Sequence, residues 1–184
     1  MLKPLDVVVG LKAHLWPHGD DWSYERLASA LGISTSQAHM SLKRLGRAGL
    51  YRATDRSLRT HAFTLFAMHG IPFVFPVEPG GPALGCPTAH AAPPLCAQLD
   101  YAEAYVWPGA GDVPGRAITP LHRVAPHAAA LDARLYEALA LIDALRVGRA
   151  RDRALASDGL SRLLCSPDRD ARWLVQRDAT RQAP

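Results

Sequence analysis

Residues 22–50 read WSYERLASALGISTSQAHMSLKRLGRAGL, and this stretch predicts two short helices joined by a tight turn. Gly32 can end the first helix, because only glycine enters the left-handed conformation without a steric penalty. Ser34 and Gln37 have the S-x-x-Q spacing of a capping box, so the second helix is expected to begin at about Thr35. The stretch therefore predicts a helix-turn-helix, an arrangement that can present its second helix to DNA.

The second helix divides into an inner and an outer face. Ala38, Leu42 and Leu45 recur at helical spacing and are expected to face inward. The outward positions, which are our candidate DNA-binding residues, are Thr35, Ser36, Gln37, His39, Met40, Lys43, Arg44 and Arg47. In this set the residues from Ser36 to Met40 are expected to sample base edges, and the three basic residues to anchor phosphates. The alternative is a basic face that is merely solvated.

The segment Ile33–Leu50 resembles the recognition helix of winged helix-turn-helix transcription regulators of the MarR-like kind. The shared pattern is a hydrophobic turn residue, Ser, a variable polar run, then Leu-Lys-x-Leu and Ala-Gly-Leu. The resemblance covers roughly the first third of the chain and implies a sequence-specific DNA-binding regulator, such as a repressor. In architecture alone the chain also resembles antitoxin-type regulators, which join a winged DNA-binding domain to a partner-holding domain and repress their own operon.

The segments that flank the two helices complete the predicted domain. An apolar helix is expected from about Pro4 to Trp16, as the first of a three-helix core. A winged domain would continue after Leu50 with a hairpin, and no alternating pattern indicates one. Residues 56–70 instead have helical spacing with a glycine stop, which predicts a fourth helix in place of the wing. The contact of a wing with the DNA backbone is expected to come instead from Arg52, Arg56 and Arg59. The alternative is that these arginines are simply solvated.

The fold class expected from the whole chain is α+β. It would comprise a helix-turn-helix domain over residues 1–70, a small β-rich section over 71–121, a helical section over 122–166 and a loosely ordered tail over 167–184. Strands are predicted at residues 71–77, 105–107 and 115–121, between proline and glycine clusters.

Residues 85–96 hold three candidate zinc ligands, Cys86, His90 and Cys96. Their C-x3-H-x5-C spacing lacks a paired knuckle and a fourth ligand, so no metal is predicted and an ordered loop is preferred. Cys86 with His90 as a nucleophile and base is equally unsupported, because nothing nearby would orient the histidine.

Two helices are predicted at about 131–148 and 149–164, with apolar stripes that need cover from the middle sheet or from a second subunit. They are therefore the expected seam of a homodimer or the interface for a partner protein. Four arginines cluster where these two helices meet: Arg146, Arg149, Arg151 and Arg153. They are expected to form either a patch that binds an acidic partner or nucleic acid, or a solvated helix end.

Composition narrows the class of protein. The 184 residues are 48% hydrophobic, with no apolar run of the length a membrane span needs and no signal-peptide pattern, so a cytoplasmic protein is expected. Residues 1–60 carry nine Lys or Arg against five Asp or Glu, whereas residues 61–119 carry one against four. The basic N-terminal section suits double-stranded DNA. We find no nucleotide loop, catalytic triad or metal-spaced acids, so neither an enzyme nor a cofactor is expected. The alternative function is a protein-interaction adaptor or an antitoxin whose helix-turn-helix docks a partner protein.

Overall fold

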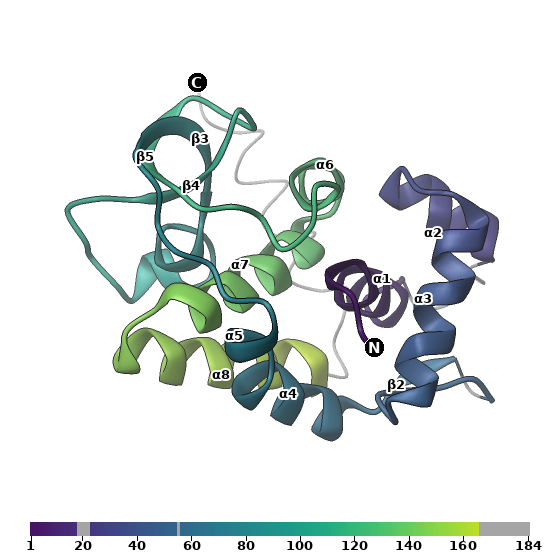
Figure 1. Cartoon of the computed structure of the whole chain (residues 1–184). Coiled ribbons are helices and arrows are strands. Elements are labelled where there is room, and N and C mark those ends of the chain that lie inside the picture. The colour runs from purple at the N-terminus through teal and green to yellow at the C-terminus, as the bar shows by residue number, and fades with distance from the viewer. Residues whose placement is uncertain (18–22, 55, 166–184) are drawn as a thin grey trace.

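The structure, a computed structural model, describes residues 1–17, 23–54 and 56–165. The predicted tail over 167–184 lies outside these residues. The fold is α+β, as expected (Figure 1). Its N-terminal part contains, in chain order, α1 (Pro4–His14), α2 (Tyr24–Leu31), α3 (Thr35–Arg47), β1 (Tyr51–Arg52), β2 (Ser57–Leu58), α4 (Thr60–His69) and α5 (Ile71–Val74). The remainder contains β3 (Pro82–Thr88), the short helices η1 (Ala89–Ala91) and η2 (Leu95–Ala97), β4 (Tyr105–Pro108), β5 (Val113–Ala117), α6 (Ala125–Leu131), α7 (Ala133–Val147) and α8 (Ala150–Cys165).

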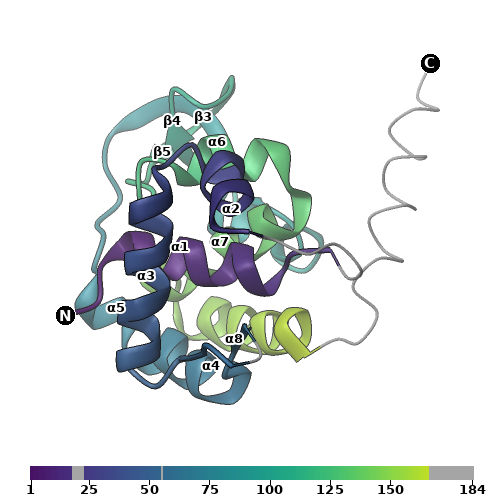
Figure 2. The same cartoon turned by 90° about the vertical axis from the view of Figure 1, so that its right-hand side faces the viewer.

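Helix α1 lies at the centre of the molecule, between α3 and α7 (Figures 1 and 2). Every residue of its stretch Val7–Leu11 is buried, because neighbours cover the helix on all sides. Gly10 permits the close approach of α3, since a Cβ at this position would lie 2.7 Å from the Leu45 side chain. The buried apolar side chains of α1, α3, α4, α7 and α8 belong to one cluster, so the predicted sections share a core.

A short antiparallel hairpin follows α3, and our sequence-based expectation that it is missing was wrong. Tyr51 pairs with Leu58 and Arg52 pairs with Ser57. Strands of two residues are too short to show an alternating pattern, which is why the sequence did not reveal them. The predicted fourth helix exists as α4, but it begins only at Thr60 because the hairpin occupies the preceding residues.

The predicted strand over 71–77 is also wrong, because the structure has the helical turn α5 at its start. Ile71 is buried and Pro72 stands in the first turn, where proline costs nothing. Phe73 and Val74 are exposed to 79% and 51%. A short apolar run does not by itself distinguish a strand from a buried helical turn.

The β-rich section is a three-stranded sheet that closes on itself, since β3 pairs antiparallel with both β4 and β5 while β4 and β5 pair in parallel. Gly85 lies where the strands crowd together, and a Cβ there would overlap the Trp107 carbonyl oxygen. The predicted strand 105–107 is confirmed, the strand expected over 115–121 ends at Ala117, and the loop expected from residue 85 begins as β3.

Helix α7 is enclosed within the chain. Asp132 caps it by accepting the N–H groups of Arg134 and Leu135 at 3.0 and 3.1 Å. The helix packs against α1, α5, α6, α8 and β3, so its apolar stripe is covered by the same chain. A dimer seam along α7, as the sequence suggested, would therefore have no exposed apolar stripe to use.

A buried polar network fastens α7 to the closed sheet. The Asp143 carboxylate accepts hydrogen bonds from Thr88 Oγ1 at 2.8 Å, Trp107 Nε1 at 2.6 Å and Arg146 Nη1 at 2.7 Å. Arg146 also donates to the carbonyls of Phe75 and Thr119. Burial raises the pKa of Asp143, and the hydrogen bonds and the Arg146 charge oppose that rise.

Candidate nucleic-acid interface

The turn between α2 and α3 is fixed by local hydrogen bonds. Gly32 takes the left-handed conformation at a φ of 63° and ends α2. At the start of α3, the Ser34 N–H donates to Gln37 Oε1 at 2.9 Å and the Gln37 N–H donates to Ser34 Oγ at 3.2 Å. This is the capping box that the sequence predicted, and it fixes the start of α3 at Thr35.

The outermost line of α3 consists of four residues at spacings of four, three and four, which we call the outer ridge: Ser36, Met40, Lys43 and Arg47. All four are exposed. Figure 2 shows α2 and α3 in front of α1 and α7, so no other element of the described chain covers this side. The ridge thus offers a hydroxyl, a thioether and two cations to a partner.

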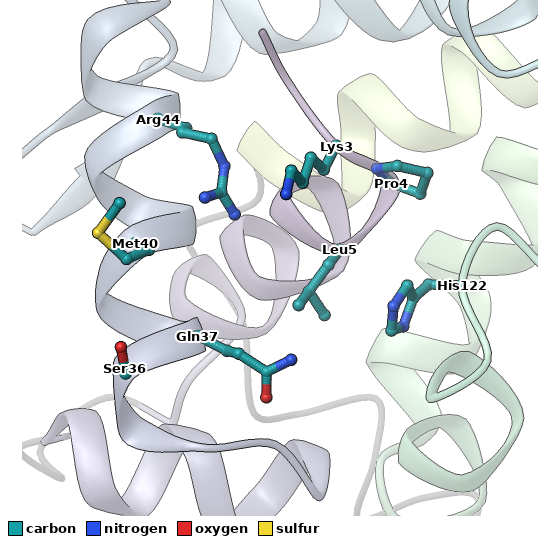
Figure 3. Close-up of a pocket in the computed structure, with 8 residues that line it drawn as sticks. All are labelled: Lys3, Pro4, Leu5, Ser36, Gln37, Met40, Arg44 and His122. Carbon is teal, nitrogen blue, oxygen red and sulfur yellow. The ribbon is translucent and has the colours of Figure 1, made fainter.

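The other candidates lie on the two flanks of α3. Thr35 and His39 are exposed on the flank toward α2, where the His39 ring meets Tyr24 edge to face at 5.2 Å between centroids. Gln37 is exposed on the flank toward α1, with its carbonyl oxygen committed to Ser34. Its amide nitrogen is turned toward His122 (Figure 3).

Arg44 does not face outward, so the expectation that it lies on the outer face of α3 with the other candidates was wrong. Its guanidinium makes two hydrogen bonds to the Asp6 carboxylate, Nε to Oδ2 at 2.8 Å and Nη2 to Oδ1 at 2.6 Å. The Asp6 side chain is fully buried and the Arg44 side chain is 19% exposed. The hydrogen bond to Asp6 raises the pKa of Arg44 above its ordinary value. The ion pair joins α3 to the first turn of α1, and Asp6 neutralises the positive charge of Arg44.

Three more arginines stand at or beside the β1–β2 hairpin. Arg52 lies in β1, Arg56 precedes β2 with a positive φ of 52°, and Arg59 follows β2. All three are exposed. They extend the positive charge of Lys43 and Arg47 beyond the C-terminal end of α3.

A cavity of about 500 Å³ opens on the α1 flank of α3, as Figure 3 shows. It is lined by Lys3, Pro4, Leu5, Ser36, Gln37, Met40, Arg44 and His122. His122 comes from the segment between β5 and α6 and faces Leu5 and Gln37 across the cavity. Burial lowers the pKa of His122, and the neighbouring Arg123 charge lowers it further.

Arg151 and Arg153 of the expected arginine patch are exposed, whereas other candidates have structural partners. Arg146 is buried beside Asp143 and is not part of a surface patch, while the Arg149 guanidinium lies 5.8 Å from the Tyr101 ring centroid. His90 bonds the Glu103 carbonyl through Nε2 and packs between Tyr101 and Tyr105. Within the described residues, no three His, Cys, Asp or Glu side chains come together as metal ligands.

Sequence reasoning missed Asp6, Lys3 and His122. Asp6 carried a signal, because it is the single charged residue within the apolar stretch Leu5–Leu11. An acid on the buried side of a helix requires a cationic partner. Lys3 and His122 carried none, since only the folded chain brings them beside α3.

No family model matches this chain, and no curated protein or solved structure matches it. The resemblance to winged helix-turn-helix regulators therefore rests on the residues quoted above. None of the helices in the described part of the chain combines the length and apolarity of a bilayer-spanning segment.

Proposed function

We propose that this protein is a sequence-specific DNA-binding transcription regulator that acts in the cytoplasm, with a winged helix-turn-helix formed by α1 to α3 and the β1–β2 hairpin. The observation that carries the proposal is the uncovered outer ridge of α3, which combines two groups suited to base edges with two cations (Figure 2). In this arrangement Ser36 and Met40 meet the bases, and Lys43 and Arg47 meet phosphates of the flanking strands. The hairpin arginines add sequence-independent affinity.

A single recognition helix reads only a few base pairs, so we propose that two copies bind a palindrome. Because α7 is enclosed, the pairing surface has to be sought elsewhere on the chain. Phe73 and Val74 on α5 are the leading candidates, since both are large, apolar and more than half exposed. Sedimentation of Phe73→Ser against the unchanged protein tests whether this surface pairs two copies.

Selection from a randomised duplex library is the direct experiment. We expect the unchanged protein to enrich one short motif. Met40→Ala is expected to change or relax the motif, whereas Lys43→Ala weakens binding to all sequences about equally. Arg151→Ala, which removes the same charge from an exposed site on α8, is the control and should retain both motif and affinity. Absence of any enriched motif would contradict sequence-specific reading.

The second candidate function is a protein-interaction adaptor or an antitoxin, for which the exposed Phe73 and Val74 are the favouring observation. An adaptor would bind its partner through α5 and would show no preference among duplexes. An antitoxin-type repressor would show both activities, and Phe73→Ser would remove its partner binding.

A further inference from the structure

The cavity beside α3 presents hydrogen-bond donors. Gln37 Oε1 accepts the Ser34 N–H at 2.9 Å and lies 3.1 Å from Ser34 Oγ, so only the amide N–H groups of Gln37 are left for the cavity. Figure 3 shows this nitrogen turned toward His122 and the oxygen turned away from it.

His122 is oriented in the same sense. Its Nδ1 accepts the Val124 N–H at 3.3 Å, so a neutral ring carries its proton on Nε2 and donates from there. Lys3, on the rim of the cavity, has donors and no acceptor on its side chain. Three donor-bearing residues from distant parts of the sequence thus line one space.

The cavity also has a positive charge balance. Arg44 and Asp6 neutralise one another, and the Asp6 carboxylate is covered by the Lys3 N–H as well as by the guanidinium. Among the described residues that line the cavity, Lys3 is therefore the cation that no carboxylate neutralises. Pro4, Leu5 and Met40 add apolar walls that suit the organic part of an ester.

We propose that this cavity is a phosphate-binding site in which Lys3, Gln37 and His122 donate to the anionic oxygens. Donors from Lys3, Gln37 and His122 around one space, with the Lys3 cation among them, fit a phosphate monoanion or diester. The proposal as it concerns DNA rests on the function proposed above. An α-helix about 10–12 Å across fills a major groove about 12 Å wide, so one DNA strand passes along each flank of the helix. The strand on the α1 flank of α3 would run over this cavity.

The first experiment needs no DNA. The full chain, labelled with ¹⁵N, is titrated with inorganic phosphate at constant ionic strength, and the Gln37 side-chain amide and His122 imidazole signals are followed. We expect a saturable shift of both signals in the unchanged protein. Lys3→Gln and His122→Asn should weaken phosphate binding at least about fivefold, since each removes one donor to a charged oxygen. His122→Asn keeps an acceptor for Val124, and Arg151→Gln on α8 is the charge-matched control, which should bind phosphate normally.

The second experiment distinguishes a DNA phosphate from a free phosphate ester. If the DNA strand supplies the phosphate, Lys3→Gln reduces the slope of log K against log salt by about 0.9, and added phosphate competes with DNA. If a free ester is the ligand, the phosphate titration persists and the slope does not change.

The site is overturned if phosphate produces no saturable shift, or if Lys3→Gln binds phosphate as tightly as Arg151→Gln. That result would leave a DNA-binding α3 intact. Conversely, phosphate binding by a protein that binds no duplex would support the site and overturn the proposed function.

Discussion

Replacing Arg44 by methionine removes the guanidinium that pairs with the fully buried Asp6 carboxylate. Of the three hydrogen bonds that this carboxylate accepts, the two from Arg44 are lost and the one from the Lys3 backbone N–H remains. Loss of one partner of a buried ion pair costs about 3–5 kcal/mol. Because the Arg44 side chain is 19% exposed, we expect the lower end, about 3 kcal/mol. With a urea dependence of about 2 kcal/mol per molar, the unfolding midpoint should fall by about 1.5 M.

Urea denaturation followed by circular dichroism measures this change. Arg47→Met is the matched control, because Arg47 is an exposed arginine on the same helix and should alter stability by no more than about 0.5 kcal/mol. The double variant Asp6→Asn/Arg44→Met removes the orphaned charge, so it should be at least about 1 kcal/mol more stable than Arg44→Met alone. A normal urea midpoint for Arg44→Met, combined with reduced DNA affinity, would refute the structural role and restore Arg44 as a phosphate anchor.

Three further predictions concern the core and the cavity. Arg146→Met should destabilise the fold by about 3–5 kcal/mol at pH 7 by orphaning Asp143. Because burial raises the pKa of Asp143, the folded variant holds a proton that the unfolded chain releases above about pH 3.9, so part of this loss should be recovered as pH falls; a pH-independent loss would contradict this. Gly85→Ala should cost at least about 1–3 kcal/mol because its Cβ overlaps the backbone of the neighbouring strand, whereas Gly81→Ala, which meets nothing within 4 Å, is the control; equal thermal midpoints would refute the tight closure of the sheet. His122 should titrate below the ordinary value of about 6.5 by NMR in phosphate-free buffer, and its contribution to stability should therefore decline as pH falls through about 6.5; a midpoint at or above that value would be inconsistent with its burial.

The helix-turn-helix segment was predictable because its signals are local. Ser34 and Gln37 are three residues apart, and Gly32 acts through its own backbone dihedrals, so the sequence alone indicated the turn. The outward face of α3 followed from helical periodicity, which places Lys43 and Arg47 opposite the apolar stripe. The α+β class followed from the same patterns.

What was missed depends on contacts between distant residues. Helical periodicity does not show that Arg44 pairs with Asp6, 38 positions earlier. A side chain on the flank of a helix can turn outward to solvent or inward to a neighbouring helix, and the sequence does not say which neighbour lies there. The β3 sequence, PALGCPT, lacks the alternation of apolar and polar residues that indicates a strand. Gly85 has no side chain because the closed sheet leaves no room for a Cβ, and prolines are unusual in strands. The hairpin after α3 was missed because each of its strands has only two residues, too few for an alternating pattern.

The salt dependence of DNA binding tests the central claim most directly. The slope of log K against log salt is measured by fluorescence anisotropy for the unchanged protein, for Lys43→Ala/Arg47→Ala on the outer ridge, and for Arg151→Ala/Arg153→Ala on α8. The two variants lose the same charge from exposed sites. We expect the ridge variant to lower the slope by about 1.8, since each phosphate contact contributes about 0.9, and the α8 variant to leave it unchanged. Equal slopes for all three proteins would contradict the assignment of α3 as the DNA-binding helix.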